Sequence, residues 1–264
     1  MRAVAAVAMA LTATGGCGDE ASPTTEVEVE VEVEALVVRV VAEYPHDTSA
    51  FTQGLLLHDD RFYESAGQYG QSSLREVDPH TGAVIRRVDV PPSFFAEGLA
   101  LVDDRLIQLT WQEGTAFVYD IDTFEQVDTF SYPGEGWGLC ETDDELYMSD
   151  GSGTLTVRDP DTFEGRKTIE VTNQGESVDE LNELECVGER VYANVRQTDT
   201  ILEIDPTTGD VVAEIDASGL LDASERDALP AGAVLNGIAA ADNGRLYLTG
   251  KYWPLLFEVE LVPA

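Results

Sequence analysis

Basic residues are scarce in this sequence. Of its 264 residues, 15 are Lys or Arg and 51 are Asp or Glu, which gives a formal net charge of −36. Nucleic acids and anionic lipid surfaces are bound through clustered Lys and Arg, so the composition argues against both kinds of partner. The chain is nevertheless able to fold, because 43% of its residues are hydrophobic and can bury a core.

Histidine, cysteine and long apolar runs are also rare. The three histidines, His46, His58 and His80, are isolated and follow no metal-ligand spacing, which argues against a histidine zinc site. The sequence has no Ser-His-Asp order, phosphate-binding loop or dinucleotide fingerprint. We therefore expect no metal and no cofactor. After the amino terminus, no stretch is apolar enough to cross a bilayer.

The amino terminus has the pattern of an export signal. Met1 and Arg2 precede an apolar run over 3–13, which is too short for a membrane-spanning helix. The small residues before Cys17 resemble a bacterial lipobox, although Thr14 stands where Leu is usual. Residues 1–16 are thus predicted to be a signal peptide, with lipidated Cys17 anchoring a periplasmic or cell-envelope lipoprotein of a bacterium. Ordinary cleavage nearby, with Cys17 incidental, is the alternative.

Residues 17–34 have the composition of an acidic linker. Glu and Val alternate over 26–34, and a strand there would carry carboxylates along one whole face. Like-charge repulsion favours an extended, solvated segment, so the globular domain is expected over 35–264. Within it, Cys140 and Cys186 occupy matching places in neighbouring repeats. In an exported protein they can form a disulfide, and two buried thiols are the alternative.

Short phrases recur along the globular part. A polar turn followed by an alternating strand, as in a β-hairpin, occurs at 59–63, 103–107, 143–147, 188–192 and 243–247. Upstream of each copy lies a second phrase, typified by Gln-Gly-Leu at 53–55, and downstream come turns with Asp-Pro or Asp-Thr-Phe. Each unit is predicted to be a four-stranded antiparallel meander of about 45 residues, the size of a propeller blade.

The repeats predict an all-β fold, a five-bladed β-propeller of four-stranded antiparallel blades. The last unit is one strand short, and the orphan strand at 36–42 would complete it, so that N- and C-terminal strands close the ring. Helical periodicity outside the signal is limited to 220–229. The residues that begin the second phrase should meet at one end of the central channel: Gln53, Glu97, Trp137, Asn182 or Glu183, and Asn236. Their variation indicates a composite site, and a merely water-lined channel is the alternative.

Nine phrases occur in the order found in one known family. They are FTQGL at 51–55, ESAG at 64–67, EG at 97–98, QLTW at 108–111, GWGL at 136–139, SDGS at 149–152, LNELE at 181–185, LNGIA at 235–239 and TGKYWP at 249–254. Together they resemble the plant and bacterial glutaminyl-peptide cyclotransferases (glutamine cyclotransferases) over about 44–261. The resemblance implies a five-bladed propeller, in agreement with the repeat count. It also implies conversion of N-terminal glutamine to pyroglutamate with loss of ammonia and without a metal.

The resemblance also implies roles for individual residues. Glu97 matches the acid/base glutamate, whose pKa an aromatic enclosure would raise by desolvation. Trp111 and Trp137 match tryptophans that wall the pocket. Gln53 and Asn182 match residues expected to hydrogen-bond the substrate.

Lys251 matches a pocket lysine that would orient Glu97 or stabilise oxyanion charge. Further pocket residues are expected to be Phe51, Phe95 and Asn236. Arg196 departs from the family, which usually carries another pocket tryptophan there, so substrate preference or turnover is expected to differ.

The expected partners are peptides or proteins with N-terminal glutamine, bound by a monomer that meets a membrane through its lipid anchor alone. The sequence leaves two other functions open. A Ca²⁺-dependent propeller lactonase would need acidic and amide side chains converging on a channel metal. A non-catalytic propeller would bind peptides through the same funnel without releasing ammonia.

Overall fold

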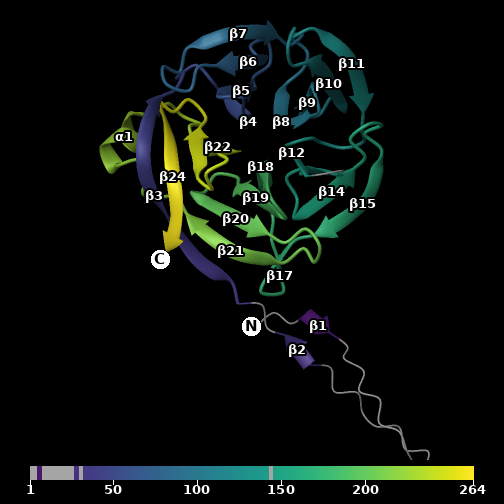
Figure 1. The fold of residues 1–264 in the computed structure, drawn as a ribbon, viewed down its shortest axis with the longest axis vertical. Coiled ribbons are helices and arrows are strands. Elements are labelled where there is room, and N and C mark those ends of the chain that lie inside the picture. Colours follow the sequence, from purple (N-terminus) through teal and green to yellow (C-terminus); the bar gives the residue numbers. More distant parts are fainter. Residues whose placement is uncertain (1–4, 8–26, 30–31, 143–144) are drawn as a thin grey trace, which may run out of the picture.

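Residues 5–7, 27–29, 32–142 and 145–264 are described by the computed structural model (Figure 1). Strands make up most of this part of the chain, and α1 (Ala223–Ala228) is its single α-helix. The all-β class predicted from the sequence is confirmed, and α1 lies within the segment that showed helical periodicity. No helix in the described ranges is long and apolar enough to span a membrane.

The predictions for the amino terminus lie largely outside the described residues. β1 (Ala5–Val7) pairs antiparallel with β2 (Val27–Val29), whereas residues 1–4, 8–26 and 30–31, which include Cys17, fall outside the description. The same holds for residues 143–144 in the third copy of the recurring turn. The signal peptide, the lipid anchor and the linker therefore stay predictions.

Three separate sheets have the expected four-stranded antiparallel pattern. The first consists of β4 (Thr52–His58), β5 (Arg61–Ala66), β6 (Ser73–Val77) and β7 (Val84–Asp89). The second consists of β8 (Ala96–Val102), β9 (Arg105–Thr110), β10 (Thr115–Asp120) and β11 (Gln126–Ser131). The third consists of β12 (Leu139–Thr142), β13 (Glu145–Met148), β14 (Thr154–Arg158) and β15 (Gly165–Glu170).

The remaining long strands form one eight-stranded sheet, so the prediction of five four-stranded blades is met only in part. Its order is β18-β19-β20-β21-β3-β24-β23-β22. The bounds are β3 (Glu34–Pro45), β18 (Leu181–Val187), β19 (Arg190–Val195), β20 (Thr200–Ile204), β21 (Val211–Asp216), β22 (Leu235–Ala240), β23 (Leu246–Gly250) and β24 (Leu255–Pro263). A small hairpin, β16 (Thr172–Asn173) and β17 (Glu176–Ser177), precedes β18.

The eight strands are continuous because β3 is long enough to pair on both edges. Residues 34–37 pair in parallel with 213–216 of β21. Residues 36–45 pair antiparallel with β24. The orphan strand thus pairs with the C-terminal strand, as expected, and also joins the last two sets of four strands.

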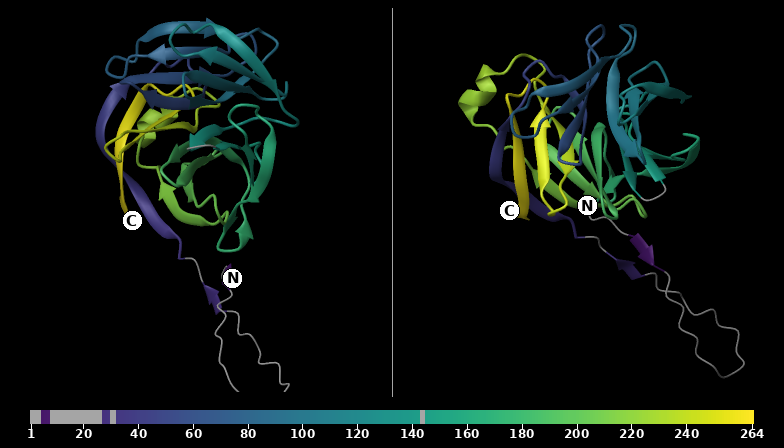
Figure 2. Two further views of the ribbon diagram at one scale, coloured as in Figure 1. Left: turned by 45° about the vertical axis from the view of Figure 1, so that its right-hand side comes forward. Right: turned by 45° about the horizontal axis from the view of Figure 1, so that its top comes forward.

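The sheets stand around a common centre, with β4, β8, β12, β18 and β22 innermost and β7, β11 and β15 at the periphery (Figure 1). Each inner strand contacts the next one, and β22 contacts β4, so the five inner strands close a ring. Neighbouring inner strands approach so closely that a Cβ on Gly98 would lie 2.6 Å from the Leu139 nitrogen. This contact explains the glycine of the second phrase. Figure 2 shows α1 projecting from the side of the ring, away from the point where β3 enters.

The recurring turns have the backbone conformations that their residues favour. Asp59 and Asp60 between β4 and β5 have φ values of 47° and 56°, as a two-residue hairpin turn requires. In the outer turns Gly82 has a φ of 64°, and Phe124 and Phe163 adopt 60° at the equivalent place. Both phenylalanine rings are buried, and this burial offsets the strain of a left-handed conformation.

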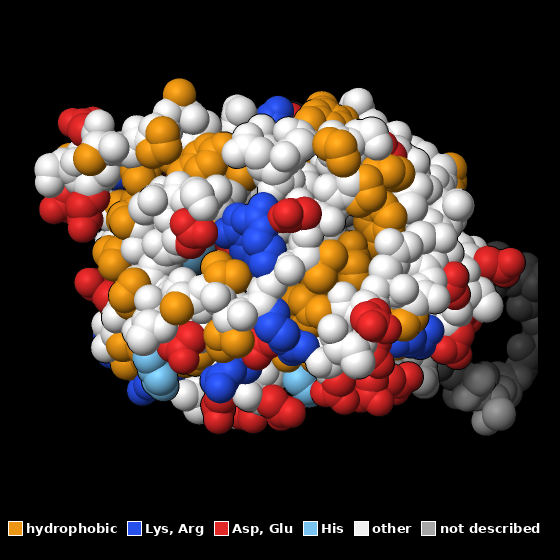
Figure 3. All heavy atoms as spheres, turned by 90° about the horizontal axis from the view of Figure 1, so that it is seen from above, with side chains coloured by type: hydrophobic (Ala, Val, Ile, Leu, Met, Phe, Trp, Pro, Cys, Tyr) orange, Lys and Arg blue, Asp and Glu red, His pale blue; other side chains and the backbone are white. Residues whose placement is uncertain are grey.

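Apolar side chains between neighbouring sheets form the core. Leu74 of β6, Leu99 of β8 and Phe117 of β10, for example, belong to one buried cluster. On the face shown in Figure 3, acidic groups are spread widely and basic groups lie beside them. Among the described residues, ion pairs between basic and acidic side chains include Arg86–Glu76 and Arg105–Asp161. Most of the few basic residues are thus paired with acidic neighbours.

Candidate active site

A cavity of about 360 Å³ lies at the end of the ring where the inner strands begin. Gln53 is on β4, Glu97 on β8 and Asn182 on β18, each the second residue of its strand. The antiparallel partner strands contribute residues that follow their ends, such as Lys251 after β23. The lining consists of Phe51, Gln53, Gln68, Phe95, Glu97, Trp111, Trp137, Asn182, Arg196, Gln197, Gly232, Val234 and Lys251.

Nine of the ten predicted site residues line this one cavity, and their chemical roles stay predictions. Asn236 is the exception, because it is fully buried beneath Gln53 and does not reach the lining. Sequence reasoning missed Gln68, Gln197, Gly232 and Val234. Gln68 comes directly after the phrase at 64–67, and Val234 comes directly before the phrase at 235–239. Proximity to those phrases was the available signal.

A chain of amide hydrogen bonds positions Glu97. Asn236 Nδ2 donates to the Thr52 carbonyl oxygen at 2.8 Å and to Gln53 Oε1 at 3.2 Å. Gln53 Nε2 in turn donates to Glu97 Oε1 at 2.8 Å. Within the described part of the chain, the other carboxyl oxygen of Glu97 has no hydrogen-bond donor, which leaves it available to a ligand.

The electrostatic surroundings of Glu97 disfavour its ionised form. Its side chain is nearly inaccessible (4% exposed), and this burial raises the pKa of Glu97 well above the ordinary value of a carboxyl group. The Lys251 ammonium opposes the shift, and the negative charge of Glu135 adds to it. Burial therefore favours the protonated form of Glu97, the form in which it can act as an acid.

Lys251 is the cation that faces this carboxyl group. Burial lowers the pKa of Lys251 to about 8, against the stabilising charge of Glu97. Its Nζ lies 4.7 Å from the centre of the Phe51 ring, within the range of a cation–π contact. No carboxylate of the described residues lies within ion-pair distance of Lys251, so its charge is free to act on a ligand.

A carboxylate that the sequence analysis missed fixes the two tryptophan walls. Trp111 Nε1 and Trp137 Nε1 donate to the same oxygen, Glu135 Oε2, at 2.7 and 3.0 Å. Gln112 Nε2 donates to the other oxygen at 2.8 Å. Burial opposes ionisation of Glu135, but the donors Trp137, Gln112 and Trp111 outweigh it and lower its pKa. The indole rings are thus tied to one anchor.

Glycine allows one of these rings to lie flat against the backbone. Gly151 has a φ of +84°, and a Cβ there would lie 2.5 Å from the Trp137 ring. On the opposite wall, Phe95 packs edge-on against Phe51 and Trp111, with ring centres 6.0 and 5.8 Å apart. The cavity is therefore enclosed by aromatic faces around the Glu97 carboxyl group.

Asn182 lines the cavity with a side-chain amide. Its Oδ1 is buried and has no hydrogen-bond partner among the described residues. Its backbone oxygen accepts from Ser149 Oγ at 2.6 Å, which fixes β18 against the third sheet. An unpaired buried amide oxygen is costly, so this atom is suited to accept an N–H of a bound ligand.

Glu183 replaces the glycine of the second phrase and holds three inner strands together. Its two carboxyl oxygens accept from the Leu55 nitrogen at 3.2 Å and the Ile238 nitrogen at 2.9 Å. These donors belong to β4 and β22, so Glu183 joins β18 to both. Burial raises its pKa well above the ordinary value. Glu183 thus supports the strands that carry Gln53 and Asn236 and does not line the cavity.

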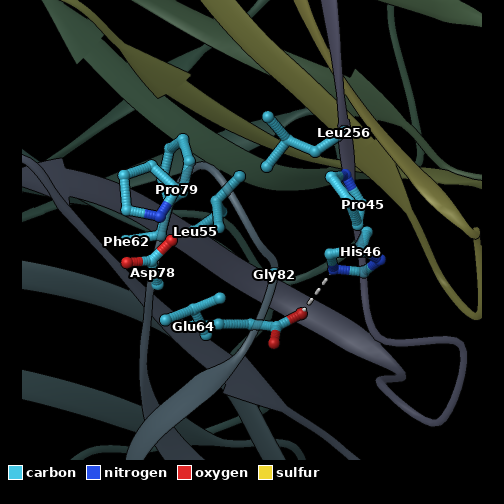
Figure 4. Close-up of a pocket in the computed structure, with 10 residues that line it drawn as sticks. Pro45, His46, Leu55, Phe62, Glu64, Asp78, Pro79, Gly82 and Leu256 are labelled. Carbon is cyan, nitrogen blue, oxygen red and sulfur yellow. Dashed lines mark hydrogen bonds and ion pairs between the residues drawn. The ribbon is translucent and has the colours of Figure 1, made fainter.

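A buried charge network that includes His46 and Glu64 lies beside a second, small pocket (Figure 4). His46 Nε2 faces Glu64 Oε1 at 3.1 Å, and its Nδ1 lies 2.8 Å from the Trp253 carbonyl oxygen. Arg75 is close to the same carboxylate, at 3.7 Å. The free space among these groups amounts to about 10 Å³, too little for a substrate. The network therefore fastens the segment after Lys251 to β5.

A disulfide joins Cys140 of β12 to Cys186 of β18, with Cα atoms 5.4 Å apart. Of the two alternatives left open by the sequence, the structure thus contains the disulfide. It links the inner strand that follows Trp137 to the inner strand that carries Asn182.

No group of three or more His, Cys, Asp or Glu in the described ranges is arranged to hold a metal ion. His46 is engaged by Glu64, and His58 faces Asp59 at 3.5 Å on the surface.

Known proteins share both the sequence and the fold. The profile of the glutamine cyclotransferase family matches residues 8–261. A glutaminyl-peptide cyclotransferase from Arabidopsis thaliana is 42% identical over 234 residues, covering 86% of this chain and 72% of the plant protein. The crystal structure of Myxococcus xanthus glutaminyl cyclase superimposes with a TM-score of 0.83 at 41% identity, covering 88% of this chain and all of the bacterial one.

Proposed function

This chain belongs to the glutamine cyclotransferase family, and we propose that it converts the N-terminal glutamine of peptides and proteins to pyroglutamate, releasing ammonia. The observation that carries the mechanism is a buried carboxyl group, Glu97, held by Gln53 in an aromatic cavity opposite Lys251. The reaction needs an acid/base group beside an amine and an amide. Glu97 is the acidic residue that lines this cavity, and burial raises its pKa.

The cavity would hold the substrate folded on itself, so that its α-amine lies next to its own side-chain amide carbon. Trp111 and Trp137 enclose the methylene groups, and Asn182 Oδ1 accepts an N–H of the amine or amide. Holding the two reacting groups together makes the ring closure effectively unimolecular, which is a large part of the rate gain.

Glu97 would move one proton between the two nitrogens. As the carboxylate, it accepts a proton from the α-amine while the new C–N bond forms. As the acid, it donates that proton to the amide nitrogen while the old C–N bond breaks and ammonia leaves. The carboxylate is restored, and every proton is accounted for.

Lys251 would stabilise the tetrahedral intermediate. Negative charge develops on the amide oxygen during attack, and a desolvated ammonium without an ion-pair partner is suited to meet it. Removing such a group typically costs about 10²- to 10³-fold in turnover. Because its pKa is lowered to about 8, Lys251 stays protonated at neutral pH and loses its charge in mild alkali.

We infer that the ring of five inner strands is that of a five-bladed propeller. The eight-stranded sheet then comprises two blades, β18–β21 and β22–β24 with β3, joined along the parallel β21–β3 pair. The closed cycle of contacts between inner strands supports this architecture. It brings one residue from each unit to the cavity or to the layer beneath it.

Ammonia release from a Gln-initiated peptide, with and without EDTA, tests the proposed function. We expect release that survives chelation, because Glu97 and Lys251 supply the acid/base and electrostatic chemistry. Loss of activity with EDTA and recovery with Ca²⁺ would favour the lactonase class. Peptide binding by a folded sample without any ammonia would favour a non-catalytic propeller.

We also propose that the protein is exported as a monomeric lipoprotein anchored through Cys17. The positive start, short apolar run and small residues before that cysteine support the proposal. Expression of a Cys17→Ser variant beside the parent tests it. The parent should sediment with the cell envelope, and the variant should be released; identical partition of the two would refute the anchor.

A further inference from the structure

Arg196 stands at the edge of the cavity where a peptide would leave it. The deepest lining residues, Gln53, Glu97, Asn182 and Lys251, are each at most 6% exposed. Arg196, which follows β19, keeps 34% of its side chain exposed. A substrate whose first residue fills the deep part therefore places its second residue beside this guanidinium.

The guanidinium is held in place but has donors to spare. Its Cζ lies 5.5 Å from the centre of the Trp137 ring, and its Nε donates to Glu180 Oε2 at 2.7 Å. Its two terminal nitrogens form no hydrogen bond within the described residues. A planar fork of this kind binds a carboxylate through two parallel hydrogen bonds.

The charges around Arg196 leave room for an added carboxylate. Lys251 is a second cation that lines the same cavity, close enough for the two charges to influence each other. Of the acids, Glu135 is already engaged by three N–H donors. Glu180 is bound to Arg196 through Nε and is half-buried, so it occupies one edge of the guanidinium only.

We propose that Arg196 forms a carboxylate subsite for the part of the substrate next to the N-terminal glutamine. This inference rests on the proposed cyclotransferase function and adds the substrate class: Gln-initiated peptides with an acidic second residue. The α-carboxylate of a Gln-initiated dipeptide has the same chemistry and reaches the same place.

Three substrates separate these cases by ammonia release: Gln-Glu-amide, Gln-Gln-amide and Gln-Gln with a free carboxylate. The wild type should turn over the acidic amide with a kcat/KM about three- to tenfold above that of the neutral amide. Arg196→Met should bring this ratio close to one, Arg196→Lys should retain part of it, and added salt should reduce it. A gain confined to the free dipeptide would assign the subsite to the α-carboxylate.

Arg226→Gln is the matched control. Arg226 is equally exposed (34%) and paired with Asp199, but it lies outside the cavity lining. Its loss should leave the ratio unchanged. Equal rates for all three substrates in the wild type at low salt, or a ratio that survives Arg196→Met, would overturn the subsite while leaving the cyclotransferase function intact. Failure to release ammonia from any substrate would instead refute the proposed function.

Discussion

Glu135→Gln should loosen both tryptophan walls with a single isosteric change. In the native protein, Trp111 Nε1 and Trp137 Nε1 share one carboxylate oxygen and Gln112 Nε2 uses the other. A glutamine side chain offers one acceptor oxygen and one amino group. Whichever way its amide is turned, at least one native N–H donor then faces another donor.

The size of the effect follows from the hydrogen bonds that are lost. Hydrogen bonds to charged groups contribute about 1.5–3 kcal/mol when buried, and Glu135 is only half-buried. Each indole N–H exchanges a charged acceptor for a neutral amide oxygen or a facing amino group, so a loss of about 1 kcal/mol for each of the two contacts gives about 2 kcal/mol in total. At 1.4 kcal/mol per factor of ten, kcat/KM should fall about 10- to 30-fold. The loss should appear chiefly in KM, because the walls contact substrate and transition state alike.

The pH dependence of activity gives a second readout of the Glu135→Gln change. The carboxylate of Glu135 helps to raise the pKa of Glu97, so removing it should lower that pKa. The acid limb of the kcat/KM–pH profile, where Glu97 must be ionised to accept a proton, should therefore move to lower pH. A merely structural role for Glu135 would not move this limb.

Glu113→Gln provides the matched control. Glu113 also raises the pKa of Glu97, but it binds Tyr69 and the Phe95 nitrogen rather than the tryptophans. This control should shift the acid limb in the same direction without changing the emission of Trp111 and Trp137. Unchanged KM and unchanged tryptophan emission in Glu135→Gln, or an acid limb that moves upward, would refute the reasoning.

Three further predictions concern charge and covalent links. Lys251→Met should lower kcat about 10²- to 10³-fold, and wild-type activity should decline as pH rises through about 8. Burial opposes protonation of His46, but the charge of Glu64 outweighs it and raises the pKa of His46 above its ordinary value of 6.5. The stabilisation that comes from protonated His46 is therefore complete below pH 6.5, and it is lost as pH rises through the higher pKa of His46 in the folded protein. Urea unfolding of His46→Gln should thus show a larger deficit at pH 5.5 than at pH 8.5, and an equal deficit would contradict it. Replacing Cys140 and Cys186 by Ser should lower the free energy of unfolding by about 3–4 kcal/mol. An unchanged urea midpoint would argue against a stabilising disulfide between them.

Much of the site was predictable because the repeat carries its geometry. Gln53, Glu97 and Asn182 each take the second position of an inner strand, so aligning the repeats was enough to bring them together. Arg196 and Lys251 follow the ends of the adjacent strands and come to the same end by antiparallel pairing. Local patterns thus specify which residues meet.

The remaining features depend on distances that a repeat does not encode. The parallel contact of β3 with β21 arises from the length of β3, and nothing in the phrase at 36–42 requires it. Glu135 lies in a glycine-rich loop outside every repeated phrase, and its importance appears only when two indole nitrogens converge on it. Asn236 occupies an equivalent position to Gln53 but is buried one layer below, where it orients Gln53 instead of the substrate.

The most direct test of the account is the rate of ammonia release by Glu97→Gln. This change keeps the shape of the side chain and a hydrogen-bonding partner for Gln53, but it removes the group that accepts and returns the proton. We expect thermal stability equal to or above that of the wild type, because a buried carboxyl group is replaced by a neutral amide. Turnover should fall about 10²- to 10⁴-fold. A folded Glu97→Gln protein with wild-type turnover would contradict the central claim.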